Sequence, residues 1–125
     1  MVTIMSIEAS RIVIIEDNSQ TVVMTKDILE FLGFVVTVVN DMQTALVDII
    51  PYLTELGVTH VLLDANLTPG NKSGNDGRLL AKAIKEQAPS VKIIGFSGEP
   101  QDYVDIPMGK RDCNLQTLRR ALFPE

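Results

Sequence analysis

The stretch His60-Val61-Leu62-Leu63-Asp64-Ala65-Asn66 joins a short apolar run to a single carboxylate. A continuous apolar run of this length, followed by turn-forming residues, is typical of a strand buried on both faces of a parallel sheet. In an open α/β sheet, ligands bind in the crevice beyond the carboxyl ends of the strands. Asp64 stands at such an end, although an aspartate there is also a common turn former or helix cap. Whether it marks a site depends on which other polar groups reach the same edge.

Four other segments have the pattern of strands. Two β-branched runs cover 11–15 and 34–39, an apolar run covers 91–96, and the strand that ends at Asp64 begins at Val58. Residues 100–109 alternate as a short strand would, and Pro107 within them favours a sheet edge or a bulge. The sequence therefore predicts five strands.

Apolar residues at helical spacing predict helices over 21–32, 45–56, 78–87 and about 115–122. The first is expected to be capped by Asn18 or Ser19 and stopped by Gly33. The second should kink or restart at Pro51, because proline removes a helical hydrogen bond.

The alternation of these elements predicts the α/β class. We expect a doubly wound, five-stranded parallel sheet with helices on both faces and right-handed crossovers. Leu46 and Leu79 are assigned to the buried faces of their helices. The polar linker 65–77 is longer than most connections in such folds, which favours a functional or flexible loop. At this length we expect one domain over 1–125, with no output domain.

The composition and net charge of the chain limit the partners and the cellular location that we expect. The net charge of −5 argues against nucleic acid or an anionic membrane as the main partner, although Lys110, Arg111, Arg119 and Arg120 are a local exception. The single cysteine, Cys113, excludes an internal disulfide framework and suits a reducing compartment. The first ten residues lack the basic and apolar regions of a secretion signal. The expected location is the cytoplasm.

Several polar groups are expected at the edge where Asp64 lies. Glu16 and Asp17 follow the first strand, and Ser97 ends the fourth. Carboxylates crowded together repel one another unless they share a cation. An oxygen-only ligand set suits Mg²⁺, so Asp64 could attack a phosphoryl group as a nucleophile beside that ion. Lys110 is the expected ammonium group that neutralises charge on the transferring oxygens.

The motifs Ile-Ile-Glu16-Asp17-Asn18, Val-Leu-Leu-Asp64-Ala-Asn66 and Ile-Gly-Phe-Ser97-Gly98, with Lys110 ahead of the last helix, resemble the receiver domain of two-component response regulators. The resemblance covers essentially the whole chain. It implies a flavodoxin-like fold and the following roles: Asp64 as phosphoacceptor, Glu16 and Asp17 as the acidic pair of the Mg²⁺ site, Asn66 as a metal ligand through its backbone carbonyl, Ser97 as the switch hydroxyl, and Lys110 as the ion-pair lysine.

The resemblance further implies a stand-alone receiver in a phosphorelay. Such a protein takes a phosphoryl group from a histidine kinase or a histidine phosphotransfer protein, with Mg²⁺ as cofactor, and signals through altered binding of a downstream protein. It catalyses only its own phosphorylation and dephosphorylation, so no turnover enzyme is expected. A homodimer is compatible with this interpretation.

The sequence departs from the receiver pattern in three places. The loop after Asp64 is longer than usual, with an apparent insertion around 71–75. The chain between Ser97 and Lys110 is too short for the full fourth helix, which is expected to be shortened or absent. Arg111 follows Lys110 where proline is customary, and Pro107 stands where a switch aromatic is usual.

Two alternatives remain open. One is a receiver-like interaction module whose partner binding does not depend on phosphate. The other is a phosphatase of the haloacid-dehalogenase type, which resembles this chain in its strand-end aspartate but has a second aspartate where Asn66 stands here.

Overall fold

A five-stranded parallel sheet forms the centre of the computed structural model, which describes residues 10–64, 75–97 and 102–124. The spatial order of the strands is β2-β1-β3-β4-β5. The strands are β1 (Arg11–Ile15), β2 (Val35–Val39), β3 (Val58–Asp64), β4 (Lys92–Ser97) and β5 (Ile106–Gly109). The doubly wound α/β fold expected from the sequence is confirmed, and Pro107 does lie in an edge strand.

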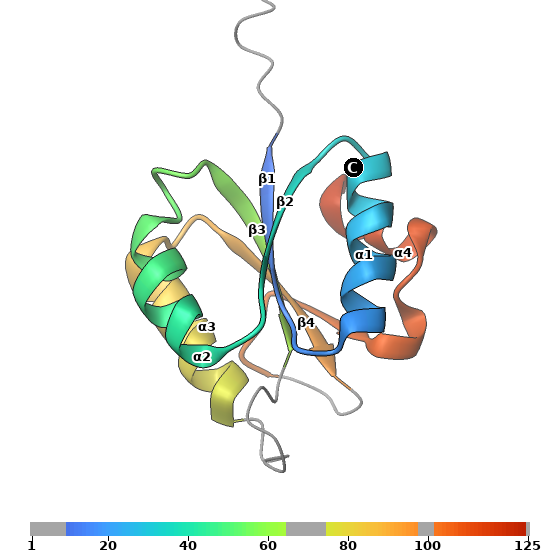
Figure 1. The fold of residues 1–125 in the computed structure, drawn as a ribbon. Helices are drawn as coiled ribbons and strands as arrows, with labels where there is room; N and C mark the ends of the chain where they lie inside the picture. The colour runs from blue at the N-terminus through green and yellow to red at the C-terminus, as the bar shows by residue number, and fades with distance from the viewer. Residues whose placement is uncertain (1–9, 65–74, 98–101, 125) are drawn as a thin grey trace, which may run out of the picture.

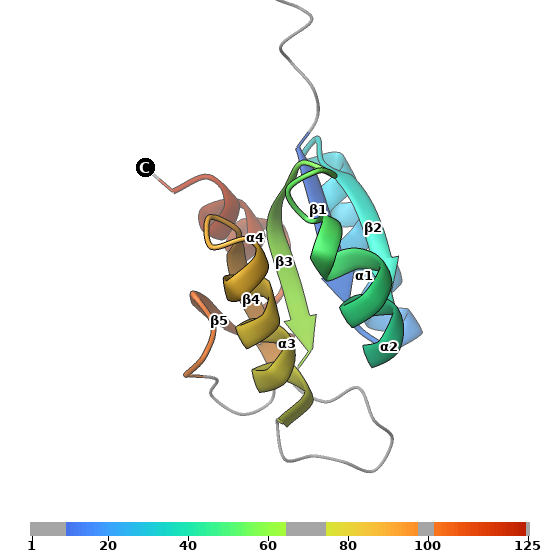
Figure 2. The same cartoon turned by 90° about the vertical axis from the view of Figure 1, so that its left-hand side faces the viewer.

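Helices cover both faces of the sheet (Figures 1 and 2). On one face lie α1 (Ser19–Phe31) and α4 (Leu115–Leu122), and on the other lie α2 (Met42–Thr44) and α3 (Asn75–Gln87). The chain after α2 continues as a π-helical turn, η2 (Ala45–Ile49), and a 3₁₀ turn, η3 (Ile50–Tyr52); a further 3₁₀ turn, η4, spans Lys110–Asp112. No helix in the described ranges is long and apolar enough to cross a membrane.

Two apolar cores sandwich the sheet, because alternate strand residues point to opposite faces. Ile12, Ile14 and Leu62 pack with α1 and α4, while Val13 and Leu63 pack with the layer of α2 and α3. All five side chains are fully buried. Burial on both faces explains why the strands are continuously apolar instead of alternating with polar residues.

The ends of α1 follow from its sequence. The side chain of Asn18 accepts a hydrogen bond from the Thr21 N–H at 2.9 Å, which caps the helix. At the other end Gly33 adopts a φ of 100°, a conformation that costs glycine little and other residues more. Both the predicted cap and the predicted stop are confirmed.

The prediction that Leu46 lies on the buried face of the second helix is wrong, whereas the break predicted at Pro51 is confirmed. The backbone widens to η2 and then tightens to η3 around Pro51, which has no N–H to donate to the preceding turn. This change of period turns Leu46 outward, where it is 40% exposed, while Ala45 and Ile50 are buried. A single helical period of 3.6 residues could not place these side chains correctly.

The third helix also differs from the prediction. It begins at Asn75 instead of Arg78, so the loop after β3 is shorter than expected. Asp76 and Gly77 are buried in its first turn, whereas Leu79 is 58% exposed. The buried stripe of the helix continues through Leu80, Ala81 and Ile84. Most of the apparent insertion around 71–75 lies outside the described residues.

The connection between β4 and β5 contains no helix in its described part. Residues 102–105 are bends, and residues 98–101 lie outside the description. This agrees with the expectation of a shortened or absent fourth helix. Arg78 of α3 lies 3.5 Å from Asp102 and stacks over the ring of Tyr103, 4.9 Å from its centroid. The connection is therefore held against α3.

Asp105 anchors the start of β5. Its carboxylate accepts hydrogen bonds from Lys85 Nζ at 2.6 Å and from the Ile93 N–H at 2.7 Å. Lys85 also donates to the Val91 carbonyl at 3.0 Å. Burial alone would raise the pKa of Asp105, but these bonds and the positive charge of Lys85 outweigh it and hold the pKa below 3.8.

We expect Asp105→Asn to lower the free energy of unfolding at pH 7 by about 1 kcal/mol, since a partly exposed charge pair is screened by solvent. At pH values above the ordinary pKa of a carboxyl, the lowered pKa of Asp105 contributes to the stability of the fold. This contribution is lost as the pH falls through the lowered pKa. The difference between wild type and variant should therefore shrink as the pH falls below the ordinary pKa of the carboxyl and through the lowered one.

Urea unfolding between pH 7 and pH 2.5 measures this dependence. The matched control is Asp102→Asn, because Asp102 and its partner Arg78 are mostly exposed. That control should change stability by less than about 0.5 kcal/mol at every pH. An equal effect of both substitutions would contradict the role assigned to Asp105.

Candidate functional site

The register of the sheet brings the predicted site positions to one edge. Ile15 pairs with Leu63, so Glu16 and Asp64 each lie one residue beyond a shared rung. Asp64 in turn pairs with Phe96, one residue before Ser97. Ser97 pairs with Gly109, and Lys110 follows directly in η4. The carboxyl ends of β1, β3, β4 and β5 therefore meet at the same level.

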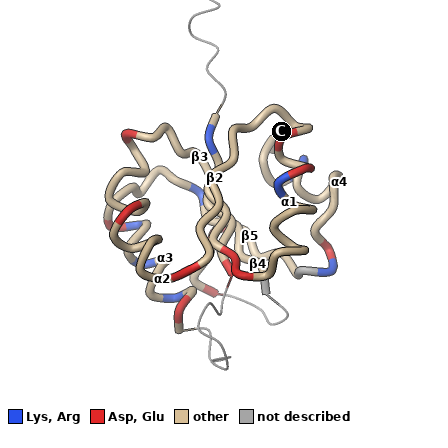
Figure 3. Tube along the Cα trace, in the orientation of Figure 1, with Lys and Arg blue, Asp and Glu red and all other residues tan. Residues whose placement is uncertain are grey.

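An acidic cluster of Glu16, Asp17 and Asp64 occupies this edge. One carboxylate oxygen from each residue lies within 4.8 Å of the others. Glu16 is fully buried and Asp64 is 5% exposed, whereas Asp17 is exposed to solvent. Figure 3 shows acidic residues at this end of the molecule, where β1 and β3 end. The three carboxylates predicted from the sequence to converge do so.

The turn from β1 into α1 shapes this cluster. The Glu16 N–H donates to the Val39 carbonyl at 3.0 Å, which ties the turn to β2. The Glu16 carboxylate accepts through Oε2 the N–H groups of Asp17 and Asn18, at 3.1 and 3.2 Å. These bonds fold the side chain back over its own turn, next to the N-terminus of α1. The positive end of the helix dipole favours negative charge at this position.

The cluster fits a hard divalent cation. Its donors are carboxylate oxygens only, which is the ligand set that Mg²⁺ and Ca²⁺ prefer. Three carboxylates at this spacing repel one another, and a bound cation would remove that repulsion. Exposed Asp17 leaves one side open to water, in keeping with the hydration that Mg²⁺ retains in proteins.

The remaining predicted residues are placed only in part. The backbone register places Ser97 and Lys110 at the expected edge of the sheet, but the structure does not describe their side chains. Asn66 lies outside the described residues altogether. The roles assigned to these three residues stay predictions.

Comparison with solved structures identifies the architecture. A receiver domain protein from Methanospirillum hungatei matches with a TM-score of 0.73 and 19% identity over 92% of this chain and 91% of that chain. One from Methylobacillus flagellatus matches with a TM-score of 0.72 and 21% identity over 92% and 97%. The chain has the CheY-like receiver fold. No protein-family model and no curated protein matches the sequence.

A third receiver-fold match is a phosphorylated response regulator. The response regulator from Burkholderia pseudomallei was crystallised with a phosphorylated aspartic acid, a calcium ion and citrate. It matches with a TM-score of 0.67 and 17% identity over 92% of this chain and 67% of that chain. At these sequence identities the matches establish the receiver fold. The chemistry of the site has to be argued from the residues of this chain.

Sequence reasoning missed one buried acid of the receiver fold. Asp76 lies in the first turn of α3 and is 7% exposed. Because 65–77 was interpreted as a polar loop, Asp76 was not recognised as a helical residue. The triplet Asn75-Asp76-Gly77 contains two residue types that commonly start helices, which was the available signal.

The lone thiol has no catalytic features. Cys113 is buried and lies 3.8 Å from the Thr25 hydroxyl. Burial raises the pKa of the thiol, although the Thr25 contact opposes the rise. A thiol with a raised pKa is a poor nucleophile at neutral pH.

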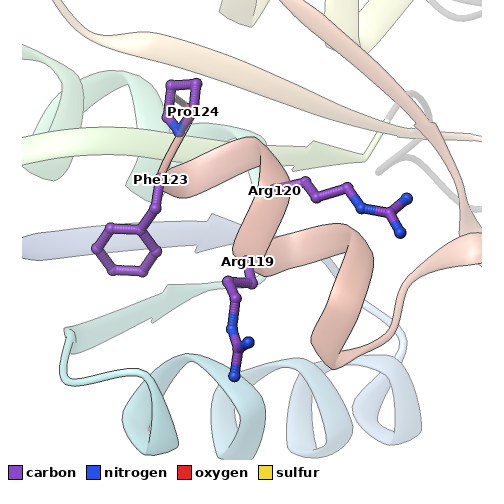
Figure 4. A pocket seen from close by; sticks show the side chains of 4 residues that line it. All are labelled: Arg119, Arg120, Phe123 and Pro124. Carbon is purple, nitrogen blue, oxygen red and sulfur yellow. The ribbon is translucent and has the colours of Figure 1, made fainter.

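One cavity among the described residues lies away from the acidic cluster. It has a volume of about 490 Å³ at the C-terminal end of α4 and is lined by Arg119, Arg120, Phe123 and Pro124. Figure 4 shows that the two arginine side chains point in different directions. Without convergent polar groups, this cavity is a weaker candidate site than the acidic cluster.

Proposed function

We propose that this protein is a response regulator receiver that accepts a phosphoryl group on Asp64 in a Mg²⁺-dependent reaction. The observation that carries the proposal is the acidic cluster of Glu16, Asp17 and Asp64 at the carboxyl edge of the sheet, with carboxylate oxygens within 4.8 Å. The phosphoaspartate and calcium ion of the Burkholderia pseudomallei response regulator, which shares the fold, support it. Glu16, Asp17 and Asp64 would hold the ion, together with the backbone carbonyl of Asn66.

The step is a transfer of one phosphoryl group. The Asp64 carboxylate attacks phosphorus and forms an O–P bond, while the bond from phosphorus to the donor breaks and its electron pair leaves with the donor. A bound Mg²⁺ would neutralise part of the charge on the phosphoryl oxygens. In this proposal the Ser97 hydroxyl donates a hydrogen bond to the transferred group, and Lys110 pairs with its charge.

The physiological donor in this proposal is a histidine kinase or a histidine phosphotransfer protein. Phosphate on Asp64 then shifts the protein between two surface conformations that differ in affinity for a downstream protein. The group is transferred once per cycle, so turnover of a free substrate is not expected. The lone buried cysteine accords with the reducing cytoplasm, where we place this reaction.

Intact-mass spectrometry tests the transfer. Incubation with acetyl phosphate and Mg²⁺ should add one phosphoryl mass, and omission of Mg²⁺ or addition of a chelator should prevent it. A known receiver labelled in parallel controls for the donor. An unchanged mass for this protein beside a labelled control would overturn the proposal.

The second candidate function is a receiver-like module that binds its partner independently of phosphate. The β4–β5 connection favours it, because its described part lacks a helix and its residues Tyr103 and Val104 pack on the apolar core that includes Leu80 and Ile84 of α3. A connection fixed in this way has less freedom to change with the state of Asp64. Partner affinity that is unaltered by phosphodonor and by Asp64→Asn would support this second function.

A further inference from the structure

Among the described residues, none pairs with the outward backbone groups at the outer edge of β2. The Val35 N–H donates to the Ser10 carbonyl, and the Glu16 N–H donates to the Val39 carbonyl. In a parallel ladder every second residue faces the same neighbour, so Val35, Thr37 and Val39 point their backbone groups toward β1. Those of Val36 and Val38 point away from the sheet. Figure 1 looks onto this edge, and neither helical layer passes in front of β2.

This edge lacks the usual protection against an added strand. Proteins blunt exposed edges with charges, proline or bulges, yet β2 is composed only of valine and threonine. Val35 and Val38 are 40% and 38% exposed. The opposite edge strand, β5, does contain a proline, Pro107. The two edges of the sheet therefore differ in their readiness to accept another strand.

The sequence of β2 is symmetric. Val35-Val36-Thr37-Val38-Val39 reads the same in both directions. If two copies pair antiparallel about a two-fold axis at Thr37, Val36 of each copy faces Val38 of the other. In an antiparallel ladder such a facing pair exchanges two N–H to carbonyl hydrogen bonds. The four outward groups of each strand would then all be paired, and threonine would face threonine across the axis.

The side chains at the axis suit this arrangement. Arg11 Nη1 donates to Thr37 Oγ1 at 2.9 Å, which leaves the hydroxyl proton of Thr37 available as a donor. Cross-strand threonine and valine pairs are among those that stabilise sheets. An isologous contact of this kind closes after two copies and does not grow into a filament.

We infer that β2 is a self-association surface, on which a second copy of this chain pairs its own β2 antiparallel about Thr37 and extends the sheet across both copies. The occupant is a second copy because the uncharged strand is complementary to itself in side chains and in backbone hydrogen bonds. This inference does not depend on the proposed phosphoryl transfer.

Sedimentation equilibrium over a concentration series tests the interface without phosphodonor or Mg²⁺. The wild type should shift from the mass of one chain to that of two. Val38→Lys should raise the dimer dissociation constant at least about tenfold, because an edge lysine opposes strand addition. The control Leu79→Lys, at an exposed apolar position on α3, should dimerise like the wild type. A monomeric wild type, or a dimer that Val38→Lys does not weaken, would overturn the inference.

Cysteine cross-linking tests the register and does not require Val38→Lys to fold. Residues that face each other without hydrogen bonds in an antiparallel pair have Cβ atoms close enough for a disulfide. Thr37→Cys should therefore form a covalent dimer under mild oxidation. Val35→Cys should not, since Val35 faces Val39 of the other copy, and the wild type is the control for buried Cys113. Equal cross-linking of both variants, or of neither, would contradict the two-fold axis at Thr37.

Discussion

Asp64→Asn is expected to slow the gain of phosphoryl mass with acetyl phosphate and Mg²⁺ at least about 100-fold, since the amide oxygen is a far weaker nucleophile than the carboxylate. The substitution keeps the size of the side chain and removes one charge from the acidic cluster. The fold should persist, because Asp64 ends β3 and the apolar residues before it form the core. The measurement is intact-mass spectrometry over a time course.

The matched control is Asp41→Asn. Asp41 also follows a strand, and it caps α2 by accepting the Thr44 N–H at 2.8 Å. Asparagine caps helices about as well as aspartate, so this variant should fold and gain phosphoryl mass like the wild type. Labelling of Asp64→Asn at the rate of the wild type would assign the phosphoryl group to another residue. Loss of labelling in both variants would show that the effect is not specific to the cluster.

Asp17→Asn is expected to have opposite effects on stability with and without Mg²⁺. Without the ion, the variant should be more stable than the wild type, because one of three mutually repelling carboxylates is gone. With Mg²⁺, the wild type should gain about 2.7 kcal/mol at an ion concentration of one hundred times its dissociation constant. Loss of a ligand should weaken Mg²⁺ binding at least about tenfold, so the variant gains less at the same concentration.

Thermal unfolding across a Mg²⁺ titration measures both effects. Asp48→Asn is the control, because Asp48 is exposed on η2 and is not part of the cluster. It should respond to Mg²⁺ like the wild type. The absence of any Mg²⁺ stabilisation in the wild type would argue against a cation site, whereas an equal gain in Asp17→Asn would remove Asp17 from it.

The order of strands and helices was predictable because the chain alternates β-branched runs with helical patterns. The runs 11–15 and 58–64 are strands with the predicted boundaries. Asn18 and Gly33 predicted the limits of α1 because capping and positive φ depend on single residues. If these strands are parallel neighbours, their carboxyl ends meet at one edge of the sheet, which predicts that Glu16, Asp17 and Asp64 lie close together.

The second and third helices were predicted less well, because the details depend on tertiary packing. Pro51 predicted the break, but nothing in the sequence predicted the π-helical turn before it, which turns Leu46 outward. The extra turn of α3 exists because Asp76 and Gly77 are buried at the end of the molecule where β3 ends. Asn75 and Asp76 were a local signal for the helix start, but the sequence of 65–77 contains no signal for the burial.

The α/β class, the strands and the acidic residues at strand ends follow from the amino-acid sequence alone, because these depend on local periodicity and residue type. Only the tertiary structure decided the strand order and register that set three carboxylates within 4.8 Å. It also placed β2 at the edge of the sheet, a position that has no local signal in the sequence. The physical reason is that distances across a sheet arise from hydrogen-bonded pairing of segments far apart in the chain.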